Sequence, residues 1–232
     1  MAEQSAFDRK QVEGAEIYVQ PEGLLDHLNL PPRFVKYVRR NMKVLQITAI
    51  VLAVIVVSGS LYDSYRTQKI EKGAAALAAA ILLDGDERQA ALQAVGSEFS
   101  GTPSSHWARI ELGHEAMRTG EFQTAITLYG AVRQDVNSRN PLFPLLTYGL
   151  AQAHEHASES ESAIAEYKAL QETAGYEGIG YLGVAGIHEA LGESDLSLSV
   201  YEEYLSILMG KVGSDSAVQQ VEEKIARLKA IK

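Results

Sequence analysis

The chain has 232 residues, no cysteine and a net charge of −9 at pH 7. Without cysteine it can form neither a disulfide nor a thiolate metal site, so its composition suits reducing and oxidising compartments alike. The acidic balance disfavours nucleic acid as a partner, because binding to a phosphate backbone depends on an excess of Lys and Arg.

The first 43 residues form a tail with polarised charge. Residues 1–30 are acidic and poor in large apolar side chains, which predicts a flexible tail. Four leucines between residues 24 and 30 leave open a short apolar turn that docks on another surface. Residues 31–43 are basic. We expect a helix that starts at Pro31 or Pro32 and runs straight into the next segment, with its charges at lipid headgroups.

A stretch of nineteen residues without a charged side chain follows, from residue 44 to residue 62. At about 1.5 Å per residue, a helix of this length spans roughly the 30 Å hydrocarbon core of a bilayer. Residues 44–62 are therefore predicted to form one transmembrane helix. Ala49 and Ala53 lie one turn apart in it and predict a small-residue patch that packs against a partner helix.

The charges beside this stretch predict its orientation. Five basic residues precede it within residues 33–43, and three follow it within residues 66–72, so the N-terminus is predicted to be cytoplasmic. In a bacterium, the chain is then a single-pass inner-membrane protein, and residues 63–232 lie in the periplasm. A signal peptide cleaved near residues 58–60 is the alternative, but 43 residues before the apolar stretch are too many for one. A lipoprotein is excluded, since no cysteine follows the stretch.

Residues 63–232 are predicted to be all-α, because Ala, Leu, Glu and Gln dominate and the alternation typical of strands is absent. This part contains fourteen basic and twenty-four acidic residues. Small residues recur in it at intervals of 35, 38 and 34 residues, where two helices could cross closely. The recurring small residues are Ala90, Ala125, Ala163 and Ser197.

The expected helix starts agree with this period. Thr102 and Asn140 each stand before a proline, as an N-cap residue stands before the first helical position. A last helix, from about Asp215 to Ala230, is expected to cover the apolar end of the stack.

The clearest unit has Leu112 in its first helix, Gly120 in its turn and Tyr129 in its second helix. It resembles the tetratricopeptide repeat, a helix–turn–helix unit of about 34 residues. Ser158 and Gly192 occupy the turn position of the two following units. The resemblance implies a solenoid of helix pairs with a capping helix.

In tetratricopeptide stacks, the first helix of each unit lines a concave face, so the resemblance also implies the residues of a protein-binding groove. These residues are Trp107, Ile110, His114, Met117, Leu145, Tyr148, Gln152, Glu155, Ile179, Leu182, Gly186 and Glu189. Gly183 and Gly186 are expected to leave a strip without side chains, where the backbone of a ligand approaches. The alternative is that Trp107 and Tyr148 pack in the core.

Two motifs could suggest chemistry. Residues 178–183 match G-x-G-x-x-G, but this pattern indicates dinucleotide binding only between a strand and a helix, and here we expect a helix alone. His154, Glu155 and His156 are dense in metal-binding side chains, but histidine ligands on one helix need a spacing of four, and we expect surface histidines. We therefore expect no catalytic residue, no cofactor, no metal and no enzyme activity.

The layout as a whole resembles the ancillary subunit of the bacterial Sec translocon. The resemblance is carried by residues 65–72, by the alanine-rich residues 74–80 and by the turn at residues 99–103. It implies a membrane-anchored scaffold that binds translocon subunits and periplasmic chaperones, with other proteins and the bilayer as its partners. The alternative is an accessory subunit that stabilises another membrane complex.

Overall fold

The computed structural model describes residues 31–210, 213 and 215–231, and all regular structure within these ranges is helical. The predicted all-α fold is confirmed for this part of the chain. The chain divides into two compact units, one ending at Asp63 and one beginning at Ser64. The expected flexible tail and the leucine turn at residues 1–30 lie outside the described residues.

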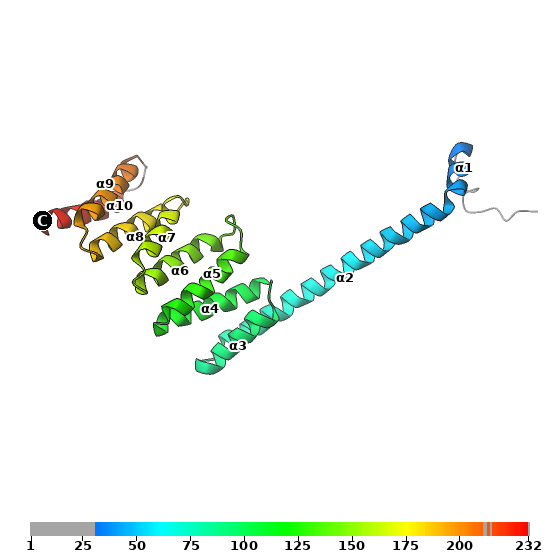
Figure 1. Ribbon diagram of the computed structural model, residues 1–232, viewed down its shortest axis with the longest axis horizontal. Helices are drawn as coiled ribbons and strands as arrows, with labels where there is room; N and C mark the ends of the chain where they lie inside the picture. Colours follow the sequence, from blue (N-terminus) through cyan, green and yellow to red (C-terminus); the bar gives the residue numbers. More distant parts are fainter. Residues whose placement is uncertain (1–30, 211–212, 214, 232) are drawn as a thin grey trace, which may run out of the picture. The chain divides into compact units, whose positions relative to one another are not determined.

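The basic segment forms a separate helix, α1 (Pro32–Arg40), which starts at the predicted prolines. Its C-cap residue is Asn41, whose backbone angles of φ −110° and ψ 18° depart from helical values. The side-chain amide of Asn41 donates a hydrogen bond of 3.1 Å to the Tyr37 carbonyl, a local bond that competes with helix continuation. The expected straight run into the next helix is therefore wrong, and α1 leaves the axis of the following helix (Figure 1).

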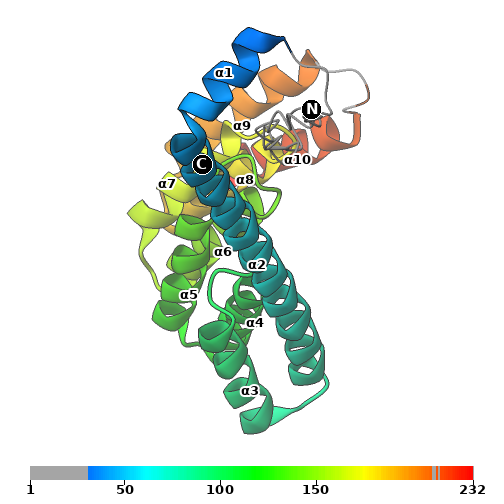
Figure 2. The same cartoon turned by 90° about the vertical axis from the view of Figure 1, so that its right-hand side faces the viewer.

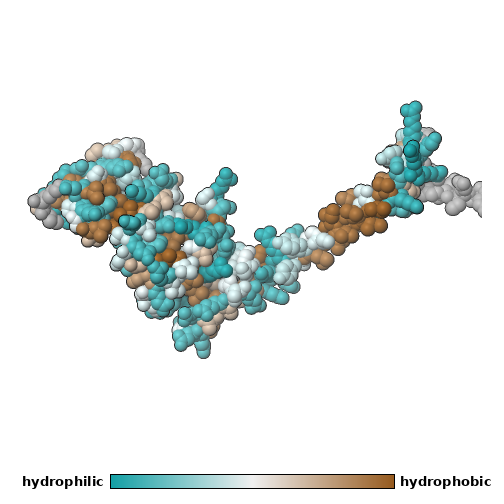
Figure 3. All heavy atoms as spheres, viewed as in Figure 1, coloured by the Kyte–Doolittle hydropathy of each residue, from teal (hydrophilic) through white to brown (hydrophobic). Residues whose placement is uncertain are grey.

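The long helix α2 (Met42–Ile81) contains the charge-free stretch and continues through the alanine-rich residues. By length and composition it can cross a membrane. Its side chains from residue 42 to residue 68 are exposed, including those of Ala49 and Ala53. In Figure 3 apolar surface is concentrated on the part of α2 nearer to α1, and polar surface follows it along the helix.

Eight shorter helices follow in the second unit, and the most extensive contacts among the described helices join neighbours in the chain. Figures 1 and 2 show them following one another in chain order. They are α3 (Gly85–Glu98), α4 (Pro103–Thr119), α5 (Phe122–Asp135), α6 (Leu142–His156), α7 (Ser160–Gln171), α8 (Glu177–Ala190), α9 (Ser194–Met209) and α10 (Asp215–Ile231).

The turns between paired helices share one backbone conformation. Gly85, Gly120, Ser158 and Gly192 have φ values of 57°, 80°, 61° and 74°, all in the left-handed region. Glycine reaches this region without steric cost, whereas a serine is strained there. Ser158 therefore stands at the position of a turn glycine, as the sequence predicted.

The recurring small residues are at helix crossings in three units and not in the first. Ala125, Ala163 and Ser197 are fully buried, but Ala90 is exposed. The buried face of α3 contains Leu92, and a residue two positions earlier in a helix points to the other side. The prediction for Ala90 is therefore wrong.

The caps agree with the sequence. The Thr102 hydroxyl accepts a hydrogen bond from the Ser105 amide at the start of α4. The Asn140 side chain accepts one of 2.9 Å from the amide of Leu142, the first residue of α6, and so caps this helix from two residues before its start. At the other end, Val221, Ile225 and Leu228 of α10 are buried in a cluster with residues of α8 and α9. This helix covers apolar surface, as expected.

Large tyrosines fill spaces that glycines leave between neighbouring helices. The Tyr129 ring of α5 lies against Gly113 of α4 and Gly149 of α6. An added Cβ atom would overlap Cε1 of the ring at Gly113 and would lie 3.2 Å from Cε2 at Gly149. The Tyr167 ring of α7 lies against Gly183 of α8 in the same way. Each tyrosine thus packs its own helix against the first helix of the following pair. Only glycine leaves enough space for the ring at these positions.

Candidate functional site

An apolar pocket of about 310 Å³ lies between α4, α5 and α6. It gathers six of the residues that the sequence placed in a groove, and four that the sequence did not place there. The six are Trp107, Ile110, His114, Leu145, Tyr148 and Gln152. The other four are Tyr129, Leu142, Leu146 and Gly149. We refer to these ten residues as the α4–α6 pocket.

Two large apolar side chains at this pocket are open to solvent. Trp107 is 43% exposed and Leu145 is 51% exposed, whereas Ile110 is only 6% exposed and belongs to the core. Tyr148 is half-buried and packs against the core cluster around Tyr167. Trp107 thus has the exposure of a groove residue, while Tyr148 combines both of the roles considered for it.

The polar groups of the pocket are few and oriented. The Gln152 amide donates a hydrogen bond of 2.9 Å to the Tyr148 hydroxyl, which fixes both side chains. The His114 ring meets the Tyr129 ring edge to face, with centroids 5.8 Å apart. None of the lining residues is an Asp, Glu, Lys or Arg. An apolar occupant would therefore not remove water from any charged side chain of the pocket.

Tyr129 differs from its counterparts in the next two units. The Tyr167 hydroxyl donates a hydrogen bond of 2.8 Å to Glu155, and the Tyr201 hydroxyl donates one of 2.7 Å to Glu189, each to a residue twelve positions earlier. The residue twelve positions before Tyr129 is Met117. Among the described residues, the Tyr129 hydroxyl therefore has no hydrogen-bond partner.

The pKa values of these tyrosines follow their surroundings. Burial, with a smaller contribution from the charge of Glu111, raises the pKa of Tyr129 to about 12. Burial and the hydrogen bond to Glu155 together raise the pKa of Tyr167 further. Burial and the hydrogen bond to Glu189 likewise raise the pKa of Tyr201. All three phenols are therefore neutral at physiological pH, and the Tyr129 hydroxyl remains able to donate a hydrogen bond to an occupant of the pocket.

The other predicted groove residues do not line this pocket. Met117 packs against the core next to it, and Leu182 packs against the cluster formed by α8, α9 and α10. Ile179 is partly exposed on α8. The carboxylates of Glu155 and Glu189 accept the tyrosine hydrogen bonds, and Glu189 also pairs with Arg227.

The expected strip without side chains on α8 is wrong at Gly183. A Cβ atom added there would lie 2.5 Å from Cγ of Tyr167, so the tyrosine ring already fills the space. Gly186, in contrast, has no atom within 4 Å of such a position and is open. The difference arises because Gly183 faces α7 and Gly186 does not.

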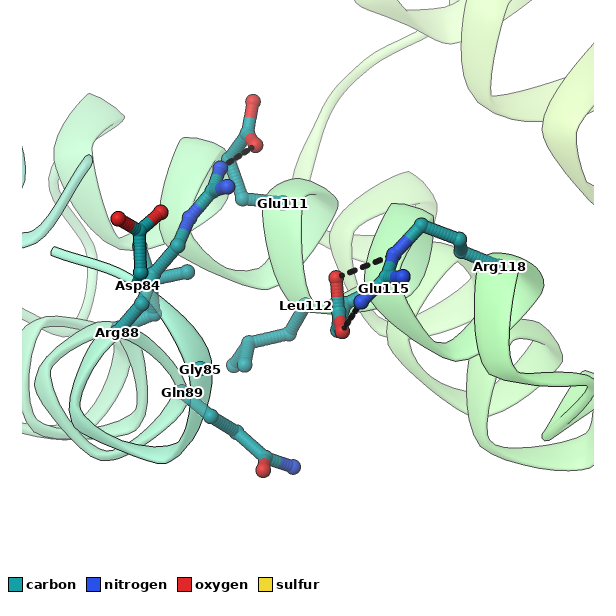
Figure 4. Close-up of a pocket in the computed structure, with 9 residues that line it drawn as sticks. Asp84, Gly85, Arg88, Gln89, Glu111, Leu112, Glu115 and Arg118 are labelled. Atoms are coloured by element: carbon teal, nitrogen blue, oxygen red, sulfur yellow. Dashed lines mark hydrogen bonds and ion pairs between the residues drawn. The ribbon is translucent and has the colours of Figure 1, made fainter. Parts of the chain in front are cut away.

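A second pocket, of about 250 Å³, lies between α3 and α4 and is polar (Figure 4). Its two arginines are both held by glutamates of α4. Arg88 pairs with Glu111 at 2.7 Å, and Arg118 forms a bidentate pair with Glu115 that lowers the pKa of Glu115. The Arg88–Glu111 pair joins α3 to α4, and the Arg118–Glu115 pair lies within α4.

The two motifs that could suggest chemistry have structural roles. The pattern at residues 178–183 lies inside α8 with no preceding strand, and Gly178 and Gly183 give space to Tyr204 and Tyr167. His154 is not a free surface residue, because its Nδ1 atom lies 2.6 Å from a Glu159 carboxylate oxygen. His156 stacks on Phe122 with ring centroids 5.2 Å apart. In the described ranges, no three His, Asp or Glu side chains are arranged to hold a metal ion.

No family model matches this chain, and a search of curated proteins finds no match.

Proposed function

We propose that the protein is a membrane-anchored, protein-binding subunit whose α4–α6 pocket receives an apolar side chain of its partner. The observation that carries this proposal is the exposure of Trp107 and Leu145 beside a cavity of about 310 Å³. Large exposed aromatic and apolar side chains beside a concave surface are typical anchors of protein–protein contacts.

The soluble unit is proposed to be a solenoid of the tetratricopeptide type. Three features support this: the left-handed turn residues recur with the sequence period, the inserted tyrosines repeat, and the main helix contacts join chain neighbours. In such a stack, each pair buries its apolar face against the next pair, and the surface of the first helices is left for partners.

The pocket suggests what the partner presents. A large apolar side chain on an extended segment of the partner would fill the pocket. A backbone carbonyl beside that side chain would accept a hydrogen bond from the Tyr129 hydroxyl. Glu155 lies one turn beyond Gln152 on α6 and is exposed, so a Lys or Arg a few residues away on the partner would be complementary.

Anchoring is proposed to occur through residues 44–62 of α2, with the N-terminus cytoplasmic and the second unit in the periplasm of a bacterium. The length and composition of α2 and the excess of basic residues before the apolar stretch support this. Protease added to spheroplasts should then digest the second unit and spare the N-terminal tail. A second unit that is protected until the membrane is opened would overturn the orientation.

The resemblance to the ancillary translocon subunit makes translocon subunits and periplasmic chaperones the first partners to test. The full chain is purified in mild detergent, and the proteins that travel with it are identified. Leu145→Ser should reduce recovery of the partner at least several-fold. Leu196→Ser is a matched control, because Leu196 is also 51% exposed but lies on α9, away from the pocket. Equal recovery with both variants would exclude the pocket as the binding site.

A partner helix in the membrane is proposed at Ala49 and Ala53. Both side chains are exposed on α2 and lie one turn apart, which supports close contact with another helix. Replacing both with Leu should weaken recovery of a membrane partner but leave binding at the pocket unchanged. Unchanged recovery of the membrane partner would mean that the apolar stretch is an anchor only.

A further inference from the structure

Helix α1 separates its basic and apolar side chains onto different sides. At about 100° per residue, Arg33, Lys36 and Arg40 lie within one arc of about 60°, and Arg39 extends this basic side by about 60° beyond Lys36. Phe34 and Val38 lie on the opposite side, and Tyr37 lies at the boundary between the two arcs. This is the pattern of a helix that rests on a charged surface with one side in an apolar layer.

The aromatic side chains of α1 are exposed. Phe34 is 51% exposed and Tyr37 is 61% exposed, so neither is covered by the described part of the first unit. Moving an exposed Phe side chain from water into an apolar layer is energetically favourable. The basic side of the same helix needs negative charge.

The break at Asn41 decides where these side chains can lie. A straight continuation of α2 would place Phe34 ten residues before the apolar stretch, about 15 Å outside it and in water. The departure of the Asn41 backbone from helical values and the hydrogen bond to the Tyr37 carbonyl turn α1 away from that axis (Figure 1). A helix turned in this way can lie along the membrane surface.

We propose that α1 is an in-plane anchor helix that binds an anionic phospholipid surface. Phe34 and Val38 enter the boundary between headgroups and acyl chains, and Arg33, Lys36 and Arg40 contact lipid phosphates. Headgroup charge attracts Lys and Arg close to the surface, and the apolar side holds the helix at a fixed depth. The proposal depends on the anchoring of α2 in a membrane but not on the α4–α6 pocket.

The test uses the full chain in phosphatidylcholine vesicles with and without phosphatidylglycerol, and brominated lipids as quenchers of tryptophan fluorescence. Trp107→Phe removes the native tryptophan, and a single tryptophan then replaces Phe34, Lys36, Val38 or Arg40. Quenching should be several-fold stronger at positions 34 and 38 than at positions 36 and 40. Equal quenching at all four positions, or none at any of them, would overturn the in-plane helix.

Two further variants separate the possible failures. A single tryptophan in place of Val51, in the middle of the apolar stretch, must be quenched if α2 is inserted. Quenching at position 51 without quenching at position 34 rejects the lipid-bound α1 alone, as expected if α1 docks on a protein instead. No quenching at position 51 rejects the membrane anchoring as well.

The lipid charge is tested by replacing Arg33, Lys36 and Arg40 with Gln in the chain that carries the Phe34→Trp substitution. Adding phosphatidylglycerol should increase quenching of the parent chain and not of the triple variant. An equal response of both chains would show that Arg33, Lys36 and Arg40 do not recognise anionic headgroups and would overturn their proposed role.

Discussion

Gly183 and Gly186 form a matched pair for testing how the helices of the second unit pack. Both lie in α8, three residues apart, and both become better helix formers when replaced by Ala, by up to about 1 kcal/mol. At Gly183, however, the new Cβ atom would lie 2.5 Å from Cγ of Tyr167, against 3.4–4 Å for an ordinary contact. The Tyr167 ring cannot withdraw easily, because it is 4% exposed and its hydroxyl is bonded to Glu155.

Overpacking a close-packed site costs about 1–3 kcal/mol, so Gly183→Ala should lower the free energy of unfolding by about 1–2 kcal/mol after the helix gain. Gly186→Ala meets no atom within 4 Å and should raise it by about 0.5–1 kcal/mol. The two variants should thus differ by about 1.5–3 kcal/mol, which at about 2–4 °C per kcal/mol separates their melting temperatures by about 3–12 °C.

The assay is urea and thermal unfolding of the full chain in detergent, followed by circular dichroism at the helical band. A Gly183→Ala chain as stable as the parent would refute the insertion of Tyr167 between α7 and α8. A destabilised Gly186→Ala chain would refute the open surroundings of that glycine.

Four further substitutions test the repeat by unfolding measurements. Ser197→Ala should raise stability by about 1 kcal/mol, because the Ser197 hydroxyl is buried without a hydrogen-bond partner among the described residues; a loss of stability would contradict this. Tyr167→Phe should cost about 1 kcal/mol and Tyr129→Phe almost nothing, since only Tyr167 donates to a carboxylate; equal costs would contradict the difference between the units. Ser158→Gly should stabilise the chain by up to about 1 kcal/mol by relieving a left-handed serine, and a cost instead would argue against that backbone conformation. The pKa of tyrosine is about 10 in the unfolded chain, and that of Tyr129 is about 12 in the folded chain. The free energy of unfolding should therefore be highest below pH 10 and should fall as the pH rises to about 12. This fall should be smaller in Tyr129→Phe.

Features that depend on local chemistry were predictable from the sequence. Ser158 was assigned to a turn because it occupies the place of Gly120 and Gly192, and the backbone conformation at that place is set by the turn itself. The cap at Thr102 was equally predictable, since a capping side chain accepts a hydrogen bond from a backbone amide only three residues away.

Features that depend on which residue stands opposite were not predictable from the sequence. Gly183 and Gly186 are the same residue type in the same helix. Only the position of Tyr167 fills the space beside Gly183 and leaves the space beside Gly186 open. Ala90 had the correct period, but the buried face of α3 is set by Leu92.

The pocket was predicted in part for the same reason. The first-helix positions gave Trp107 and Leu145, but a rule confined to first helices could not supply Tyr129 from α5. One signal was present in the sequence. Met117 stands where the two following units have a glutamate twelve residues before their tyrosine, and this difference marks the unit whose tyrosine lacks a partner.

Site-specific photo-crosslinking in native membranes tests the binding of a partner at the α4–α6 pocket most directly. A photoreactive amino acid replaces Leu145 in one chain and the equally exposed Leu196 in another, and adducts are resolved after irradiation. We predict a discrete adduct with one other protein from position 145, absent from position 196 and lost when Trp107→Ala is added. Adducts of equal yield from both positions, or none from position 145, would contradict the proposed function.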